Sequence, residues 1–283
     1  MLVVQYDGTE FYGSQVQPSV RTVQGTLTEA IGQILGRKPR LLFASRTDRG
    51  VHATHNVCAF KAEGMPMPLS QFLDALNDRM PSDLVVVSAR EVPAKFHPRY
   101  LAVRRDYVYR IWQGKREDIR YRRFAAHWPG TLDLASMRLG AMMLRGRHDF
   151  SAFALASSKI EDPKCNLSEI RLKSYGKLLR AEFRADRFLR RMVCFLVGAL
   201  VDVGSGHRWL DEIGQALGGD TAMRRFTNMP SRGLTLTGVH YPEHFFSEGF
   251  ADRFGAGRRE APAEVESETV AGDSSAAKPA KNR

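Results

Sequence analysis

Residues 41–60 read LLFASRTDRGVHATHNVCAF and form the centre of the predicted fold. Two apolar segments in this stretch, residues 41–44 and 56–60, flank a polar loop. Gly50 in the loop permits a tight turn, because glycine adopts backbone angles that other residues avoid. We therefore predict two strands joined by the loop at residues 46–50.

The sequence on both sides extends this pair of strands to a longer pattern. Residues 2–6 form a short apolar run typical of a strand. From Thr22 onward apolar residues recur every four positions, which predicts a helix that Gly36 ends. Helical spacing returns at residues 69–76, and residues 84–87 are predicted to be a buried strand. The resulting order, β-α-β-β-α-β, is the split βαβ unit of ferredoxin-like folds.

The second part of the chain repeats this order of elements without a close repeat of sequence. We predict strands at residues 106–112, 166–174, 178–185 and 234–239, and helices at residues 134–144 and 188–203. The chain is therefore expected to have an α+β fold with two related halves, residues 1–98 and residues 99–245.

Residues 246–283 are expected to form a C-terminal tail. From about residue 254 the composition shifts to Ala, Glu, Ser, Gly, Pro and Lys, with almost no apolar side chain. Such a segment cannot bury enough surface to offset the entropy lost on ordering, so we predict disorder there.

Charge is the most informative property of the whole composition. The 283 residues include 42 Lys and Arg against 31 Asp and Glu, a net charge of +11. Residues 252–283 contain six acidic and six basic residues, so the rest of the chain carries the excess. Most of the basic residues are arginines, whose planar guanidinium forms bidentate hydrogen bonds to phosphate that a lysine ammonium does not form. A basic folded body favours a polyanionic partner such as a nucleic acid.

Other classes of protein are disfavoured. No apolar run approaches the ~20 residues that a membrane-spanning helix needs. The N-terminus lacks the basic and apolar regions of a signal peptide. Three scattered cysteines do not make a disulfide framework. We expect a cytoplasmic protein with no membrane association.

The predicted loop at residues 46–50 carries the candidate chemistry. Arg46 and Arg49 flank the carboxylate of Asp48, and neighbouring guanidinium groups favour its ionised form. A positioned, ionised carboxylate acts as a nucleophile or a general base. Considered without its context, the same pattern is more typical of a turn aspartate that bonds to its own backbone.

The context resembles a known family. Residues 44–53, ASRTDRGVHA, are similar to the signature loop A-G-R-T-D-A-G-V-H-A of the TruA family of tRNA pseudouridine synthases. Further similar segments follow the family's order over roughly residues 1–245, and several ordered motifs identify a family better than one does. They include YDGT at residues 6–9, FHPR at 96–99, RDYVY at 105–109, HDFSAF at 148–153 and the helix at 188–204.

The resemblance implies both a fold and an activity. It implies two ferredoxin-like halves in one extended mixed or antiparallel sheet, with helices on one face and an active-site cleft between the halves. The implied enzyme isomerises uridine to pseudouridine at positions 38–40 of the tRNA anticodon stem-loop. It needs no cofactor and no metal, and it works as a homodimer that binds tRNA across both subunits.

The resemblance also assigns residues. Asp48 corresponds to the catalytic carboxylate, which either attacks C1′ or removes the C2′ proton, and both roles remain open. Tyr107 corresponds to the tyrosine that stacks on the uracil and helps to remove the C5 proton. Arg46 corresponds to the arginine that holds the target base out of its stack. Candidate phosphate contacts are Arg99, Arg104, Arg105, Arg187, Arg190 and Arg191.

One departure from the family affects the site directly. The family usually reads F-L-R-H-M-V-R where this chain has FLRRMVC, and the last arginine of the family pattern pairs with the catalytic aspartate. The corresponding Cys194 cannot replace a guanidinium. On a helix Arg190 and Arg191 would share nearly one face with Cys194, so we expect either arginine to take over the ion pair. The alternative is an RNA-binding paralogue with weak or no catalysis.

Two smaller departures are Ser14 for a usual Trp and Asn56 for a usual Gln. The run His52-x-x-His55-x-x-Cys58 resembles a metal site, but residues three apart on a strand point to opposite faces. An unrelated hydrolase that uses Asp48 is a third possibility and would consume water.

Overall fold

The described part of the chain contains the β-α-β-β-α-β order twice. The computed structural model describes residues 1–62, 64–155, 160–219 and 225–246. Residues 1–245 form one compact unit. The disorder predicted beyond residue 254 lies outside the described residues.

The N-terminal half follows directly from its local sequence. It contains β1 (Leu2–Tyr6), α1 (Val23–Leu35), β2 (Leu42–Phe43), β3 (His52–Ala59), α2 (Leu69–Asn77) and β4 (Leu84–Ala89). Helix α1 begins where the Thr22 side chain accepts a hydrogen bond from the Gly25 N–H, and it ends at Gly36 with φ of 69°. The strand order is β4-β1-β3, with β2 paired to β3.

The C-terminal half has the same arrangement. It is built from β5 (Arg104–Gln113), α3 (Leu134–Leu144), β8 (Lys164–Tyr175), β9 (Leu178–Ala185), α4 (Met192–Gly204) and β10 (Leu234–His240). These strands lie in the order β10-β5-β9-β8, the same relative order as in the first half. The additional elements are β6 (Ala126–Trp128), β7 (Gly146–Asp149), α5 (Asp211–Leu217), and the 3-10 helices η1 (Gly8–Glu10), η2 (Ser151–Phe153), η3 (Ser231–Gly233) and η4 (Glu243–Phe245).

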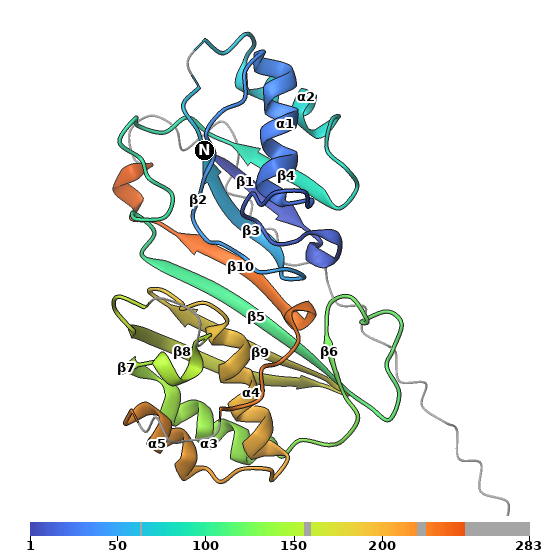
Figure 1. Ribbon diagram of the computed structural model, residues 1–283, viewed down its shortest axis with the longest axis vertical. Coiled ribbons are helices and arrows are strands. Elements are labelled where there is room, and N and C mark those ends of the chain that lie inside the picture. Colours follow the sequence, from blue (N-terminus) through green and yellow to red (C-terminus); the bar gives the residue numbers. More distant parts are fainter. Residues whose placement is uncertain (63, 156–159, 220–224, 247–283) are drawn as a thin grey trace, which may run out of the picture. The chain divides into compact units, whose positions relative to one another are not determined.

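Strand β10 joins the two halves into one sheet of ten described strands (Figure 1). It runs antiparallel to β5 and parallel to the start of β3, where Thr235 lies opposite His52 and Leu236 opposite Ala53. The sheet is therefore mixed, and the predicted α+β class with two ferredoxin-like halves is confirmed.

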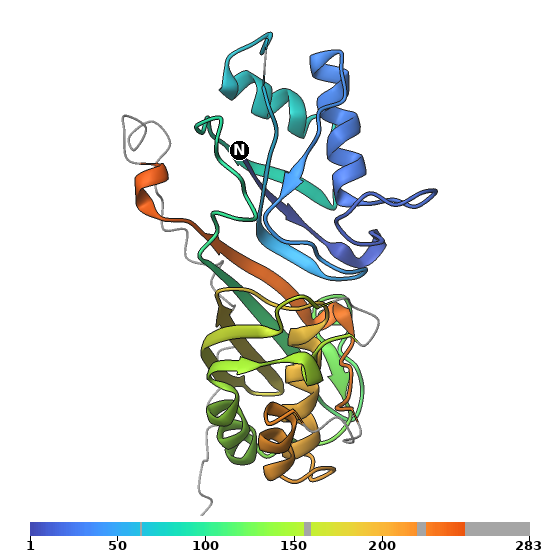
Figure 2. The same ribbon diagram turned by 60° about the vertical axis from the view of Figure 1, so that its left-hand side comes forward.

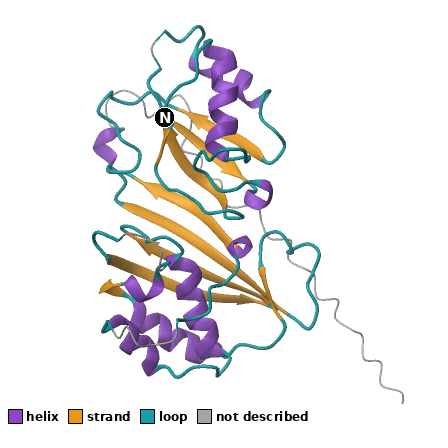
Figure 3. Ribbon diagram, viewed as in Figure 1, coloured by secondary structure: helices purple, strands orange, loops and turns teal. Residues whose placement is uncertain are grey.

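Helices cover the sheet separately in each half. Figure 2 shows α1 and α2 beside the strands of the first half, and α3, α4 and α5 beside those of the second. Colouring by secondary structure makes the same grouping visible (Figure 3). Every residue of α4 is buried, which accounts for its almost wholly apolar sequence. No helix among the described residues is long and apolar enough to cross a membrane.

Several predicted boundaries were wrong. Strand β3 begins at His52 rather than at residue 56, because its first two residues pair with residues of β10 that lie 183 positions away in the sequence. Helix α4 begins at Met192 rather than at residue 188, because Arg191 has a left-handed backbone with φ of 65°. The short elements β6, β7 and α5 were not predicted.

Candidate active site

The Asp48 loop lies against the segment that follows β1. A Cβ atom on Gly8 would lie 2.1 Å from the carbonyl oxygen of Val51, and one on Gly13 would lie 2.8 Å from that of Thr47. Both distances are far below normal contact, so the two backbones can approach only because these residues are glycines. The two ends of the loop are thus set by residues distant in sequence.

Side chains fix the first part of the loop. The Thr47 N–H donates to Ser14 Oγ at 2.9 Å, and the Ser14 N–H donates to the Thr47 carbonyl at 3.0 Å. Asn56 Nδ2 donates to the Ser45 carbonyl at 3.0 Å and to Tyr6 Oη at 3.1 Å. Tyr6 Oη is also 2.8 Å from Thr47 Oγ1. Ser14 and Asn56, which depart from the family pattern, therefore hold the loop in place.

Asp48 itself stands in a turn that its backbone closes. Its carbonyl accepts from the Val51 N–H at 3.1 Å, and Gly50 supplies the positive φ of 77° that this turn requires. The Asp48 side chain keeps 31% of its surface exposed, and its Oδ1 lies 3.4 Å from Nε of Arg190.

Arg190 precedes helix α4, so the expectation that it lies on the helix beside Cys194 was wrong. The next residue, Arg191, forms the N-cap position in a left-handed conformation. Its guanidinium donates to Asn228 Oδ1 at 2.9 Å, to the Met229 carbonyl at 3.3 Å and to Ser231 Oγ. These bonds fix the turn from which Arg190 extends toward Asp48. Arg190 thus forms the ion pair with Asp48, whereas Arg191 holds the turn that precedes α4.

Cys194 carries no charge that could pair with Asp48. Its side chain is 1% exposed, and burial raises the pKa of its thiol to about 11, against the opposing effect of the Arg191 charge. The negative charge of Asp48 also contributes to raising this pKa, so the thiol lies within electrostatic reach of the carboxylate. At neutral pH it is an uncharged packing group.

Tyr107 lies in β5, and its side chain is 8% exposed. Its ring packs edge-on against Phe188, with centroids 5.0 Å apart and an interplanar angle of 82°. Burial holds the pKa of Tyr107 well above its usual value, a hydrogen bond with the Ser45 side chain opposes this, and the Asp48 charge raises the pKa further. Tyr107 is therefore close enough to Ser45 and Asp48 for both residues to affect its pKa.

The remaining candidate arginines are divided between surface and interior. Arg46 and Arg99 are exposed, and Arg99 lies over the Tyr100 ring at 5.8 Å. Arg105 is buried and donates to the carbonyls of Ala102, Asp186 and Arg99 at 2.9, 2.7 and 2.6 Å. Its donors are used inside the protein, so the expectation of a surface phosphate contact at Arg105 does not fit its position.

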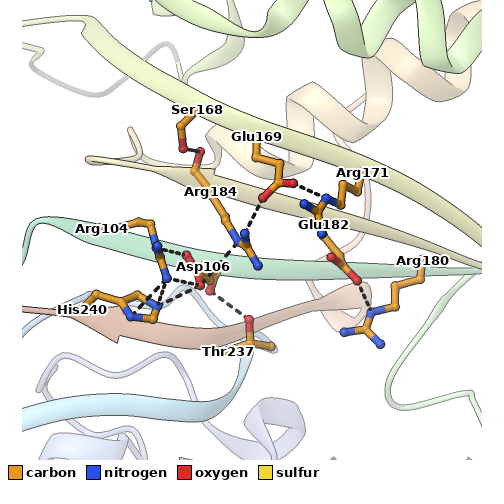
Figure 4. A network of polar contacts seen from close by, with 10 residues as sticks. All are labelled: Arg104, Asp106, Ser168, Glu169, Arg171, Arg180, Glu182, Arg184, Thr237 and His240. Atoms are coloured by element: carbon orange, nitrogen blue, oxygen red, sulfur yellow. Dashed lines mark hydrogen bonds and ion pairs between the residues drawn. The ribbon is translucent and has the colours of Figure 1, made fainter.

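Arg104 belongs to a network of charges across β5, β8, β9 and β10 (Figure 4). Its Nε donates to Asp106 Oδ1 at 2.9 Å, and His240 Nε2 lies 2.8 Å from Asp106 Oδ2. Arg187 forms an ion pair with Asp162 at 3.2 Å. Both arginines therefore form ion pairs at the surface, with side chains 41% and 43% exposed, and a phosphate contact at either one stays a prediction.

A second group of residues, most of them not predicted from the sequence, lies near the loop. His52 Nδ1 accepts from the Gly8 N–H at 3.0 Å, and Nε2 lies 3.1 Å from the Arg232 carbonyl. Residues of both halves line a pocket of about 360 Å³ beside Gly50: Thr9, Glu10, Gly50, Glu117, Arg122, Arg123 and Arg232. The grouping of arginines in residues 115–124, KREDIRYRRF, was the available indication of this pocket.

The geometry supports a specific kind of chemistry. A partly exposed carboxylate faces an arginine, and a buried aromatic ring with a hydroxyl lies near it. Such an arrangement provides an anionic nucleophile or base, a flat surface for a ring and cationic groups for phosphate. The described residues contain no group of three His, Cys, Asp or Glu side chains placed to hold a metal ion.

Known proteins share this sequence over most of its length. A family model described as tRNA pseudouridine synthase matches residues 2–101 and 141–242. Asp48, Arg46, Arg99, Arg190 and Arg191 fall within the matched stretches, whereas Tyr107 falls between them.

Individual relatives agree with the family match. A tRNA pseudouridine synthase A from Citrifermentans bemidjiense is 36% identical over 243 residues, covering 86% of this chain and 97% of the relative. Another from Thermotoga neapolitana is 40% identical over 205 residues, covering 71% of this chain and 82% of the relative. A chain in the crystal structure of a Cbf5-Nop10-Gar1 complex matches at 11% identity with a TM-score of 0.33, covering 83% of this chain and 57% of that chain. On the family match and the curated relatives, the chain belongs to the tRNA pseudouridine synthase family, a family of isomerases.

Proposed function

We propose that this protein is an active isomerase that converts uridine to pseudouridine in the anticodon stem-loop of tRNA, at positions 38–40. The observation that carries the proposal is the ion pair between Asp48 and Arg190, 3.4 Å apart. It gives the carboxylate a cationic partner although the family's usual arginine is Cys194 here. The net charge of +11 supports an RNA substrate.

The reaction needs only groups that the chain supplies. The bond from C1′ to N1 of the uracil breaks, the base rotates, and a bond forms from C1′ to C5. The proton on C5 leaves and N1 gains a proton, so the product is an isomer of the substrate. We assign to Asp48 the attack on C1′ or the removal of the C2′ proton, and to Tyr107 the stacking of the base and help with the C5 proton.

Substrate binding follows from the need to move the base. A uridine in a stem-loop must leave its stack before a carboxylate can reach its ribose. We propose that Arg46, exposed next to the loop, holds the displaced base, and that Arg99, Arg190 and Arg191 contact phosphates or order the groups that do. By the same resemblance, we propose that the protein is a cytoplasmic homodimer.

Release of tritium from tRNA labelled at uracil C5 tests the activity. The protein is expected to release tritium, and Asp48→Ala is expected to release none above background while retaining the wild-type melting temperature. Asp74→Ala, which removes an exposed carboxylate from α2, is the matched control and is expected to retain full activity. No release by the unmodified protein, together with tight tRNA binding, would instead identify an RNA-binding paralogue.

The fate of the base separates isomerisation from hydrolysis. Nucleoside analysis of the treated tRNA is expected to show pseudouridine equal in amount to the tritium released. Free uracil in the solution and an abasic site in the RNA would point to a hydrolase that uses Asp48, and would contradict the proposal.

A further inference from the structure

The pocket beside Gly50 has a composition suited to an anion. Three of its seven lining residues are arginines, Arg122, Arg123 and Arg232, and two are the carboxylates Glu10 and Glu117. Its walls come from η1 and the Asp48 loop on one side, and from the segment between β5 and β6 and from η3 on the other. The pocket therefore lies where the two halves meet, two residues along the chain from Asp48.

The three arginines differ in how they are engaged. Arg232 Nη2 forms an ion pair with Glu117 Oε1 at 2.8 Å, and Arg123 Nη1 lies 3.4 Å from Asp7 Oδ2. Arg122 is exposed, and no carboxylate among the described residues forms an ion pair with it. Arg122 is thus available to a ligand at once, whereas Arg232 becomes available when it leaves Glu117.

The pocket lies beside Gly50 and is held by direct contacts to His52, the first residue of the strand that follows the Asp48 loop. A Cβ on Gly50 would lie 3.5 Å from Cβ of Ser231, the residue before Arg232. His52 Nε2 lies 3.1 Å from the Arg232 carbonyl, and the His52 ring packs against Phe124 with centroids 4.7 Å apart. A group bound in the pocket would therefore have a defined position relative to Asp48.

The segment between β5 and β6 is itself held on the protein. Tyr121 stacks on Trp112 with centroids 5.0 Å apart and an interplanar angle of 20°. The Trp112 Nε1–H donates to the Arg116 carbonyl at 3.1 Å. Residues 102–140 lie between the two stretches that the family model matches, so the family match assigns no role to Glu117, Arg122 or Arg123.

We propose that this pocket binds a backbone phosphate of the RNA strand next to the displaced uridine, with Arg122 and Arg232 as donors and Glu117 as a competing anion. The proposal rests on the proposed function, because it takes an RNA strand at Asp48 as given. Base displacement rotates the sugar-phosphate backbone, so a fixed neighbouring phosphate defines the displaced state. Arg232 would exchange the Glu117 carboxylate for the phosphate, and the Arg122 guanidinium would make a second bidentate contact to it.

The first test measures binding, independently of turnover. The affinity of Asp48→Asn protein for an anticodon stem-loop RNA is measured with and without Arg122→Gln across a series of salt concentrations. Loss of one phosphate contact is expected to weaken binding about three- to tenfold and to lower the slope of log affinity against log salt by about 0.7–0.9. Arg120→Gln, an arginine of the same segment that pairs with Asp118 and does not line the pocket, is the matched control.

The second test asks which phosphate is bound. Single methylphosphonate substitutions are placed in turn around the target uridine of the same RNA. One substitution is expected to weaken binding to the Asp48→Asn protein and to have no further effect when Arg122→Gln is also present. Equal losses in both proteins at every position would overturn the proposal, because the arginine and the phosphate would then act independently.

Glu117→Gln gives a result of the opposite sign. Removal of the competing carboxylate frees Arg232, so this variant is expected to bind the RNA more tightly, by about two- to fivefold. Unchanged or weaker binding would show that Glu117 only supports the fold, and would contradict its proposed role as an anion that competes with the phosphate for Arg232. Because every readout here is affinity, a lack of tritium release would count against the proposed catalysis and leave these outcomes interpretable.

Discussion

Arg190 and Cys194 show how a single substitution changes an active site without removing its ion pair. Cys194 lies in the first turn of α4 and is fully buried, whereas Arg190 extends from the turn before the helix. The same charge can therefore reach Asp48 from a different backbone position. The Arg190 side chain is 62% exposed, so water screens its interaction with Asp48 and the ion pair contributes only modestly to the stability of the fold.

Arg190→Ala is expected to lower the single-turnover rate constant for tritium release about tenfold, because the carboxylate loses the cation that orients it. Arg190→Lys is expected to recover part of the loss. The measurement is single-turnover tritium release at saturating enzyme. Arg138→Ala, which removes an exposed arginine from α3, is the control. Full activity of an Arg190→Ala/Arg191→Ala double variant would show that neither arginine replaces the family's usual one.

Ser14 provides a test of the loop's hydrogen bonds. Its Oγ accepts from the buried Thr47 N–H, and the Ser14 side chain is 1% exposed. Ser14→Ala leaves this N–H without a partner, so a loss of about 1–3 kcal/mol in the free energy of unfolding is expected. Urea denaturation measures it. An unchanged midpoint would mean that water or another group satisfies the Thr47 N–H.

At the level of elements, two close backbone contacts place the Asp48 loop. Gly8 and Gly13 touch the backbone of the loop from the segment after β1, and η3 touches Gly50 from before β10. The loop is therefore held from both halves, by elements far apart in the sequence. Its conformation depends on this packing more than on the turn preferences of its own residues.

Gly13→Ala is expected to disturb the loop, because the new methyl group would lie 2.8 Å from the Thr47 carbonyl oxygen. Gly36→Ala is the matched control: Gly36 also has a positive φ, 69°, but nothing lies within 4 Å of its added Cβ. The control is expected to lose about 1–2 kcal/mol from backbone strain alone and to keep its activity. Gly13→Ala should lose more stability and most of its kcat. Equal effects on stability and no effect on kcat would show that the contact is not important.

Across the whole molecule, β10 connects the halves through hydrogen bonds to β3 and β5. The charged network of Figure 4 adds contacts between β10, β5, β8 and β9. A strand paired on both sides transmits unfolding from one half to the other. The two halves are thus similar in topology but expected to be joined in stability.

This coupling predicts a single unfolding transition. All three tryptophans, Trp112, Trp128 and Trp209, lie in the C-terminal half, whereas far-ultraviolet circular dichroism reports both halves. Denaturation curves from tryptophan fluorescence and from circular dichroism are expected to coincide. Two separated transitions would mean that the halves unfold independently despite β10.

The contact between the halves at His52 predicts a pH dependence. Burial lowers the pKa of His52 below its usual value of about 6.5, and the charge of Asp7 only partly opposes this effect. The folded protein therefore binds this proton less readily than the unfolded chain does. Its contribution to stability is complete above about pH 6.5 and is lost as the pH falls toward the lowered pKa.

The free energy of unfolding is accordingly expected to decrease between about pH 7 and pH 5, and His52→Gln should flatten this decrease. Urea denaturation at a series of pH values measures both proteins. His55, whose pKa burial also lowers, accounts for the part that remains in the variant. A slope that His52→Gln leaves unchanged would assign the whole pH dependence to other groups.

Local patterns predicted most of the elements and the location of Asp48. The spacing of apolar residues predicted the ends of α1, α2 and α3 to within a residue or two, because helical periodicity depends only on residues three and four positions apart. Ordered motifs identified the family that carries Asp48. The disordered tail and the residue boundaries of the two halves remain predictions.

Only the tertiary structure decided what surrounds that carboxylate. It showed that Arg190 and not a helical neighbour faces Asp48, that Arg105 is used inside the protein, and that Ser14 holds the loop. It also brought Glu117 and Arg122 beside Gly50. These facts depend on contacts between residues far apart in the sequence, or on the left-handed backbone of Arg191, which makes α4 begin later than its apolar sequence predicts. Local periodicity contains no information about such contacts, because they form only when segments that are distant in the sequence pack together.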